Sequence, residues 1–306
     1  MKIPTKVYPY RLPYMGSKQN IAYSLMLAML QKKPKAKHFF DIFGGGASMS
    51  LMAKQFDLKV YYSEKNKGIV NLLNFLKDNK IPKEWIKWVD RNEFKKCLGK
   101  NDPYSVFVTV VWSFGNNRKA YLFGKEVEEL KRLAFEVVVN NNVSCLEKLK
   151  ELSGLKLTMP KEKELHNRRL SFCKQIKSLK AFNRGCPELI QMQSLTQLEC
   201  CSRLQQLEYL QQLEYLNGLN LPYDEVIIYC DPPYRNTAEY TDKDFNSKEF
   251  DEWVKKIKYD VFISEYDTPF EKIASFGKMA LLNNSKDKKP LICENLYFHK
   301  GSLANG

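Results

Sequence analysis

The sequence predicts an α/β fold built on a Rossmann-like sheet, with a mainly helical domain inserted into it. Lys37–Phe43 has the apolar character of a buried strand, and it leads through the glycine turn Gly44–Gly46 into a helical apolar pattern. A second apolar run, Val226–Cys230, ends directly at the turn Asp231–Tyr234. Between them, residues 76–221 are rich in lysine and leucine, and their periodicity is mostly helical.

The glycine turn is suited to holding a ligand through the backbone. Glycine lets the chain approach a ligand closely, and the following helix N-terminus presents N–H groups and the positive end of a dipole. A second predicted strand, Lys59–Tyr62, leads to Glu64, eighteen residues after Gly46. At this spacing an acidic side chain binds ribose hydroxyls in Rossmann-type folds. Met49 stands where a dinucleotide fingerprint needs its third glycine, so the pattern favours a nucleoside without a pyrophosphate.

The turn Asp231-Pro232-Pro233-Tyr234 has the chemistry to bind a flat base that carries an exocyclic amine. The lone pair of such an amine is delocalised into the ring, and hydrogen-bond acceptors make it more nucleophilic. Asp231 can accept one N–H and the carbonyl of Pro232 the other, while the prolines restrict the turn and Tyr234 stacks on the ring. The tetrapeptide alone is equally compatible with an ordinary turn closed by a core tyrosine.

Three motifs together resemble the adenine-N6 DNA methyltransferases of the Dam type. Tyr14–Lys18 is similar to the N-terminal aromatic-Gly-Lys motif of that family, Phe43–Gly46 to its cofactor loop, and Asp231–Tyr234 to its catalytic tetrapeptide. Their order along the chain is that of the alpha group, in which a long insertion holds the target-recognition region. Tyr14 replaces the tryptophan that is frequent in the family, and Glu64 replaces the common aspartate. Both replacements keep the chemistry of the site.

The resemblance covers roughly residues 8–75 and 222–270. It implies a discontinuous catalytic methyltransferase domain formed by 1–75 and 222–306, with 76–221 as the inserted target-recognition domain. The implied activity is site-specific transfer of a methyl group from S-adenosylmethionine to N6 of adenine in double-stranded DNA, with the base flipped out of the helix. No metal is required for this chemistry.

The resemblance also assigns roles to individual residues. The residues it implies for catalysis are Asp231, Pro232 and Tyr234. The residues it implies for cofactor binding are Tyr14, Lys18, Phe43, Gly44, Gly46, Glu64 and, again, Asp231. Cytosine N4 is an alternative target, although its enzymes more often begin the tetrapeptide with serine, and RNA or a protein amide are weaker alternatives. A DNA-binding regulator that has lost catalysis is an alternative from a different class.

Composition agrees with a nucleic-acid substrate, since 49 Lys and Arg against 35 Asp and Glu give a formal charge of +14. The eight cysteines have no Cys-x-x-Cys spacing, so we expect no zinc site. The chain has no leader-like N-terminus and no apolar stretch long enough to span a membrane, which predicts a cytoplasmic protein with reduced thiols. We expect a monomer that acts on double-stranded DNA, with a cognate restriction endonuclease as a possible partner.

Several other segments carry more specific expectations. Tyr104–Trp112 has the composition of a strand, and Phe114–Lys119 is either a loop that reads base edges and phosphates or a polar connection. The hexapeptide Leu-Gln-Gln-Leu-Glu-Tyr occurs twice in 204–215 and is interpreted as a structural connector. Ser264–Tyr266, at the end of a strand beginning at Val261, is expected to line the base pocket, and 278–282 should pair with 291–298 in a closing hairpin.

Overall fold

The computed structural model describes residues 4, 12–79, 81–179, 182, 204–205, 209–235, 245–279 and 291–305. The chain forms two compact units, and each is described by itself. The first unit comprises Met1–Tyr10, Ser17–Val70 and Cys200–Gly306, and the second comprises Arg11–Gly16 and Asn71–Glu199. The main boundaries between the units fall at Val70 and Cys200. The sequence analysis placed the same boundaries after residue 75 and before residue 222.

The first unit is built on a seven-stranded sheet with the strand order β3-β2-β1-β4-β5-β7-β6, which confirms the predicted α/β class. The strands are β1 (His38–Asp41), β2 (Lys59–Ser63), β3 (Leu204–Gln205), β4 (Val226–Cys230), β5 (Val261–Glu265), β6 (Glu271–Met279) and β7 (Leu291–His299). The first five strands are parallel neighbours in the doubly wound order. Only β7 runs antiparallel, and it lies between β5 and β6.

The sheet reverses its winding between β1 and β4, which are hydrogen-bonded to each other with Asp41 opposite Tyr229. In open α/β sheets, ligands bind outside the carboxyl ends of the strands at such a topological switch point. Asp231 follows β4 directly, and Gly44 follows β1 after a two-residue link. The topology therefore brings the two motifs singled out in the sequence to one edge of the sheet.

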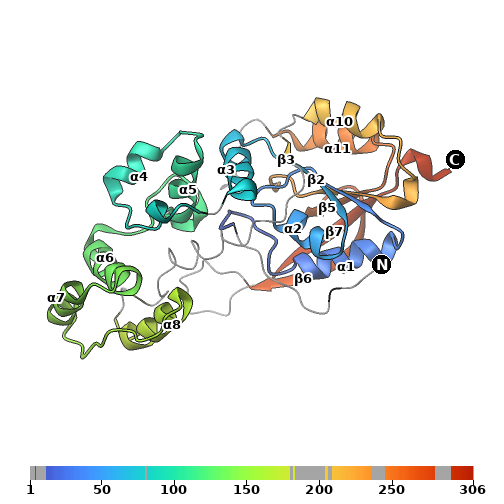
Figure 1. The fold of residues 1–306 in the computed structure, drawn as a ribbon. Helices are drawn as coiled ribbons and strands as arrows, with labels where there is room; N and C mark the ends of the chain where they lie inside the picture. The colour runs from blue at the N-terminus through green and yellow to red at the C-terminus, as the bar shows by residue number, and fades with distance from the viewer. Residues whose placement is uncertain are drawn as a thin grey trace. The chain divides into compact units, whose positions relative to one another are not determined.

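Helices cover both faces of this sheet (Figure 1). One face packs against α1 (Ala22–Lys32) and α2 (Ser48–Gln55), and the other packs against α10 (Tyr209–Asn217) and α11 (Ser247–Lys255). Along β4, Ile227 and Tyr229 point into the core on the side of α1 and α2. Ile228 points into the core on the side of α10 and α11, as the two-residue period of a strand requires. Burial on both faces explains why β4 reads as a continuous apolar run.

The described part of the second unit consists of helices joined by loops. Its helices are the C-terminal part of α3 (Lys67–Asp78), α4 (Arg91–Cys97), α5 (Pro103–Val111), α6 (Lys125–Asn140), α7 (Val143–Ser153) and α8 (Leu165–Ile176). Caps mark several of their starts, because Asp90 accepts a hydrogen bond from the N–H of Glu93 and Asn142 one from that of Cys145.

The strand predicted over Tyr104–Trp112 is wrong, because this segment is helix α5. Asp102 caps the helix by accepting from the N–H of Ser105 at 2.9 Å, and Pro103 occupies its first turn, where no N–H is needed. The run of valines suggested a strand, but α5 is buried on all sides and therefore shows no amphipathic period. Burial in the unit's core outweighs the low helix propensity of β-branched residues.

The two copies of the repeated hexapeptide differ in structure. Leu204–Gln205, which opens the first copy, forms β3 beside β2, whereas residues 210–215 of the second copy lie in α10. Residues 206–208 lie outside the described part of the chain. The same local sequence thus takes its conformation from its tertiary partners. Leu216, just beyond the second copy, is buried among the residues of the sheet face covered by α11.

The predicted closing hairpin is confirmed in its pairing but not in its bounds. β6 begins at Glu271, seven residues before the predicted start, and pairs antiparallel with β7 as far as Met279. Residues 280–290 lie outside the described part of the chain. In the described part, no helix has both the length and the apolar character needed to cross a membrane.

Candidate active site

The glycine loop is fixed by a network of short hydrogen bonds to the end of β2. The N–H of Gly44 donates to the carbonyl of Ser63 at 2.9 Å, and the N–H of Gly45 donates to Oε2 of Glu64 at 2.8 Å. The hydroxyl of Tyr62 donates to the carbonyl of Gly45 at 2.7 Å. The loop after β1 and the acidic residue after β2, predicted as two parts of one site, are therefore in direct contact.

Glu64 is held in a defined orientation at this loop. Its second oxygen, Oε1, accepts a hydrogen bond from the N–H of Asn66 at 2.9 Å, so each carboxylate oxygen is held by one backbone group. A carboxylate oxygen has further acceptor capacity, and the side chain is only half-buried. The loop therefore fixes Glu64 in a position from which a carboxylate can accept hydrogen bonds from ligand hydroxyls.

The loop also needs glycine for close packing. A Cβ atom on Gly44 would lie 2.2 Å and 2.3 Å from two ring carbons of Tyr62, which is buried. Gly45 has a φ of +47° and Ala47 a φ of +61°, so the chain turns through the left-handed region before α2 begins at Ser48. The tight turn brings the backbone of residues 44–47 close to the end of β2.

A buried ion-pair cluster lies at the turn Asp231–Tyr234. Nζ of Lys18 is 2.6 Å from Oδ1 of Asp231 and 3.5 Å from Oε1 of Glu294, which lies on β7. The same ammonium lies 4.7 Å from the centroid of the Tyr234 ring. The side chains of Lys18 and Glu294 are 4% and 2% exposed, whereas Asp231 is 18% exposed. Asp231 is therefore the member of this cluster most open to a ligand.

Further carboxyl groups surround Asp231, and burial raises their pKa values. Asp41 at the end of β1, Glu265 at the end of β5 and Glu294 each have a pKa of about 7, with desolvation as the main cause in all three. The negative charge of Asp231 contributes to each of these raised pKa values, while the ammonium of Lys18 acts against the rise at Glu294. These three buried acids therefore titrate near neutral pH.

Asp41 has a structural task in this group. Its Oδ2 accepts from the N–H of Ser50 at 3.0 Å and from the Ser50 hydroxyl at 2.6 Å. The end of β1 is thereby tied to α2, the helix that follows the glycine loop. This link stabilises the path of the loop between them.

The structure brings most of the predicted site residues into the first unit. Lys18, Gly44, Gly46, Glu64, Asp231, Pro232 and Tyr234 all belong to it. Phe43 also belongs to it, but its ring packs edge-on against Phe245 and Phe250 near the start of α11, at centroid distances of 6.1 and 5.6 Å. Tyr14 falls in the second unit, and its place beside the cofactor stays a prediction.

Sequence reasoning missed three residues that shape this site, namely Asp41, Tyr62 and Glu294. It expected Glu265 at the base pocket, within Ser264–Tyr266, but not as a buried acid. Asp41 carried a signal, since it is a carboxylate at the carboxyl end of an apolar strand that precedes a glycine turn. Glu294 carried none, because it is a single acid within a strand far from the motifs in sequence. Only the antiparallel insertion of β7 beside β5 brings it to Lys18.

In the second unit, the segment predicted to read base edges forms a tight loop. A bridge between Ser113 and Tyr121 closes it, and the ring of Phe114 is 49% exposed. Nε of Arg118 donates to Oγ1 of Thr109 at 3.2 Å, and desolvation lowers the pKa of the guanidinium. The loop thus combines an exposed aromatic ring with a partly buried cation, and both interpretations of it stay open.

A scan of the chain against models of known protein families found no match, and a search of curated proteins also found none.

Proposed function

We propose that the protein is an S-adenosylmethionine-dependent DNA methyltransferase that modifies N6 of adenine in double-stranded DNA. The observation that carries this proposal is the meeting of two motifs at the switch point of the sheet. The glycine loop follows β1 and the Asp-Pro-Pro-Tyr turn follows β4, and these strands are hydrogen-bonded neighbours. A methyl donor and a base amine held by these two turns would lie side by side.

The residues at the glycine loop fit a nucleoside that also carries a positive charge. Gly44 has no space for a side chain, which suits a loop that must pack closely on both the protein and a ligand. Glu64 would accept the ribose hydroxyls, and the backbone of Gly44–Gly46 would hold the methionine portion. The Asp231 carboxylate adds negative potential near a cationic donor. When bound, the cofactor supplies a methyl group activated by its sulfonium.

Asp231 and Pro232 prepare the target amine for attack. The Asp231 carboxylate accepts one N–H of the base and the Pro232 carbonyl accepts the other, which returns electron density to the nitrogen. Transfer would form the new N–C bond while the methyl C–S bond of the donor breaks, and the nitrogen would gain positive charge. The Asp231 carboxylate would stabilise that charge until one N–H proton is lost to solvent.

Tyr234 and Lys18 position the reacting groups. The Tyr234 ring would stack on the flipped base and offset part of the few kcal/mol that unstacking and unpairing require. Lys18 fixes the Asp231 carboxylate through the 2.6 Å ion pair, so the acceptor does not have to be oriented during the reaction.

The decisive test incubates the protein with unmethylated duplex DNA and methyl-labelled S-adenosylmethionine and identifies the labelled nucleoside. We expect N6-methyladenine from the wild type and a rate lower by about 10²- to 10³-fold or more for Asp231→Ala, which removes one preorganised acceptor. Asp224→Ala is the matched control, because Asp224 is an exposed aspartate before the amino end of β4 that pairs with Lys35. It should keep the wild-type rate.

Other outcomes of this assay would redirect the proposal. Label in N4-methylcytosine would move the activity to the alternative amine, since both targets present an exocyclic amine beside a ring nitrogen. The absence of label together with tight DNA binding would support the non-catalytic regulator.

DNA affinity should fall steeply as salt rises, because the chain carries a formal charge of +14 and phosphate contacts release counterions. With about six to ten phosphate contacts, the affinity would fall by about 10³- to 10⁵-fold between about 50 and 200 mM salt. Fluorescence anisotropy of a labelled duplex across this range measures the slope. An affinity independent of salt would argue against duplex DNA as the substrate.

A further inference from the structure

A small cavity lies beside the catalytic turn in the first unit. Its volume is about 270 Å³, just below the range of about 300 to 1,000 Å³ that is usual for drug-sized ligands, so a single flat ring system suits it. The residues that line it are Arg235, Glu265, Tyr266, Asp267, Thr268 and Pro269. Arg235 directly follows the tetrapeptide, and the others come from the end of β5 and the segment after it.

The cavity is connected to the tetrapeptide through two tyrosine rings. β5 is the parallel neighbour of β4, with Cys230 opposite Ile263, so the ends of both strands lie at the same edge. The rings of Tyr234 and Tyr266 are 4.6 Å apart between centroids and inclined at 76°. A base stacked on the face of one ring would therefore meet the other ring edge-on, which is a favoured aromatic arrangement.

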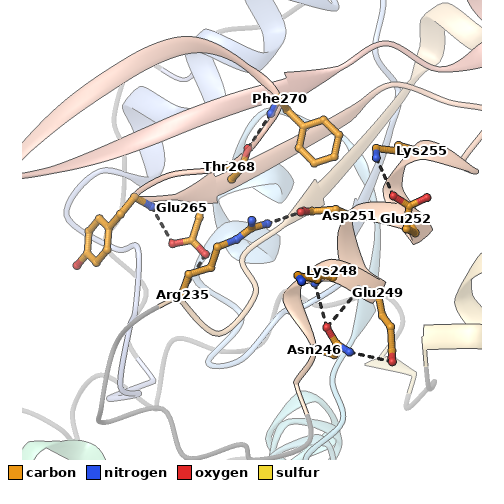
Figure 2. Close-up of polar contacts among 11 residues, drawn as sticks. Arg235, Asn246, Lys248, Glu249, Asp251, Glu252, Lys255, Glu265, Thr268 and Phe270 are labelled. Carbon is orange, nitrogen blue, oxygen red and sulfur yellow. Dashed lines mark hydrogen bonds and ion pairs between the residues drawn. The ribbon is translucent and has the colours of Figure 1, made fainter.

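Glu265 is the buried polar group of this cavity. The residue is 1% exposed, and two backbone groups fix its carboxyl group, the N–H of Tyr266 at 2.8 Å on Oε1 and the N–H of Arg235 at 3.2 Å on Oε2 (Figure 2). The Arg235 guanidinium is directed instead at Asp251 on α11, with Nη2 2.5 Å from Oδ1. The cation of Arg235 is therefore paired with Asp251 on α11, and Glu265 remains as a buried acid among the residues that line the cavity.

We propose that this cavity receives the target base and that Glu265, as a neutral carboxylic acid, donates a hydrogen bond to the ring nitrogen beside the exocyclic amine. This inference rests on the proposed function and adds a residue that determines which base is accepted. In adenine this nitrogen is N1, an acceptor, and cytosine has the equivalent acceptor at N3. Guanine and thymine carry an N–H at the corresponding ring position, so a neutral acid would face donor against donor.

The surroundings of Glu265 favour its neutral form. Its pKa is raised to about 7, mainly by burial and to a smaller extent by the charge of Asp231, while the two backbone N–H groups and the charge of Arg235 act in the opposite direction. Asn295 faces Glu265 from β7 as its register partner and carries no charge. Asp267 also lines the cavity, and as an acid it supplies no positive charge that would favour the ionised form of Glu265. Below about pH 7 the carboxyl therefore has a proton to donate.

The test combines variants of Glu265 with DNA in which 1-deazaadenine replaces the target adenine, so that a C–H stands in place of N1. The wild type should lose about 10- to 100-fold in kcat/KM on this substrate, as expected when a buried donor is left unpaired. Glu265→Ala should lower kcat/KM by a similar factor on ordinary DNA. Replacing adenine by 1-deazaadenine should then lower the kcat/KM of this variant little further. 7-Deazaadenine is the matched substrate, because it lacks a nitrogen on the other side of the ring.

Two further variants sharpen the result. Glu265→Gln keeps an N–H donor and does not titrate, so it should recover most of the activity lost in Glu265→Ala. The wild-type kcat/KM should fall as pH rises through about 7, where the acid loses its proton, whereas Glu265→Gln should lack this step. Glu252→Ala removes an exposed glutamate of α11 that pairs with Lys255, and it should behave as wild type.

The outcomes separate this inference from the function on which it rests. A wild type that methylates no base in ordinary DNA would overturn both. A wild type that forms N6-methyladenine but methylates 1-deazaadenine equally well would overturn the role of Glu265 alone. The same conclusion would follow if the loss in kcat/KM from Glu265→Ala and the loss from the 1-deaza substrate multiplied when the two were combined.

Discussion

Lys18→Met should destabilise the protein by about 3 to 5 kcal/mol, the usual cost of removing one partner from a buried ion pair. Methionine keeps much of the volume of lysine, but it leaves the carboxylates of Asp231 and Glu294 without the ammonium that lies 2.6 and 3.5 Å from them. Methyl transfer should fall by at least about 10²-fold, because the Asp231 acceptor loses its positioning contact.

The loss of stability should depend on pH. The pKa of Glu294 is raised to about 7 in the folded protein, so its contribution to stability is fully present below the unfolded pKa and is lost as pH rises through about 7. Lys18 lowers this pKa, and its removal would raise the pKa further. The difference between variant and wild type should therefore widen above about pH 7. Urea unfolding at about pH 6 and pH 8 measures this difference.

Lys33→Met is the matched control for a buried lysine. Nζ of Lys33 lies 3.0 Å from Oδ2 of Asp260, and both side chains are 6% exposed, but Asp260 precedes the amino end of β5, away from the catalytic edge. This variant should lose similar stability without the specific loss of rate at saturating substrates. In the double variant Lys18→Met/Glu294→Gln, part of the stability should return and the activity should not. Equal activity losses in Lys18→Met and Lys33→Met would show that Lys18 acts only through folding.

The sequence predicted the parts of this fold in which local and tertiary preferences agree. β4 is buried on both faces, so its apolar run had one interpretation, and the aspartate and prolines after it marked its end. The sequence identified the glycine turn and Glu64 as parts of one site because their spacing is set by the chain that connects β1 to β2 and brings them into contact. In these segments the residues that form the site are also the residues that form the turn.

Prediction failed where tertiary contacts override local preference. α5 is rich in β-branched residues and buried on every side, so neither propensity nor period identifies it as a helix. The repeated hexapeptide begins as β3 in one copy and lies within α10 in the other, which no local pattern can distinguish. Glu294 joins the site only because β7 inserts between β5 and β6, a pairing that depends on the whole sheet.

The second large effect is expected from Gly44→Ala, which should weaken binding of S-adenosylmethionine by at least about 30-fold and destabilise the protein by about 1 to 3 kcal/mol, the usual cost of overpacking. The added Cβ would lie 2.2 Å from a Tyr62 ring carbon. The ring cannot easily move away, because it is buried and its hydroxyl donates to the carbonyl of Gly45. The loop must shift instead, and with it the N–H that binds Glu64. Calorimetric titration with S-adenosylmethionine and thermal unfolding measure the two effects.

Three variants establish that the clash is the cause. Tyr62→Phe removes only the hydrogen bond to Gly45 and should have a smaller effect on cofactor affinity than Gly44→Ala. Gly154→Ala places a methyl group in open space at a φ of +68° in the second unit, so it should cost stability through backbone strain and leave cofactor affinity unchanged. Gly44→Ala combined with Tyr62→Leu makes room for the methyl group and should bind better than Gly44→Ala alone. If it does not, the contact with Tyr62 is not what requires glycine at this position, and the role of the loop backbone in holding the cofactor must be reconsidered.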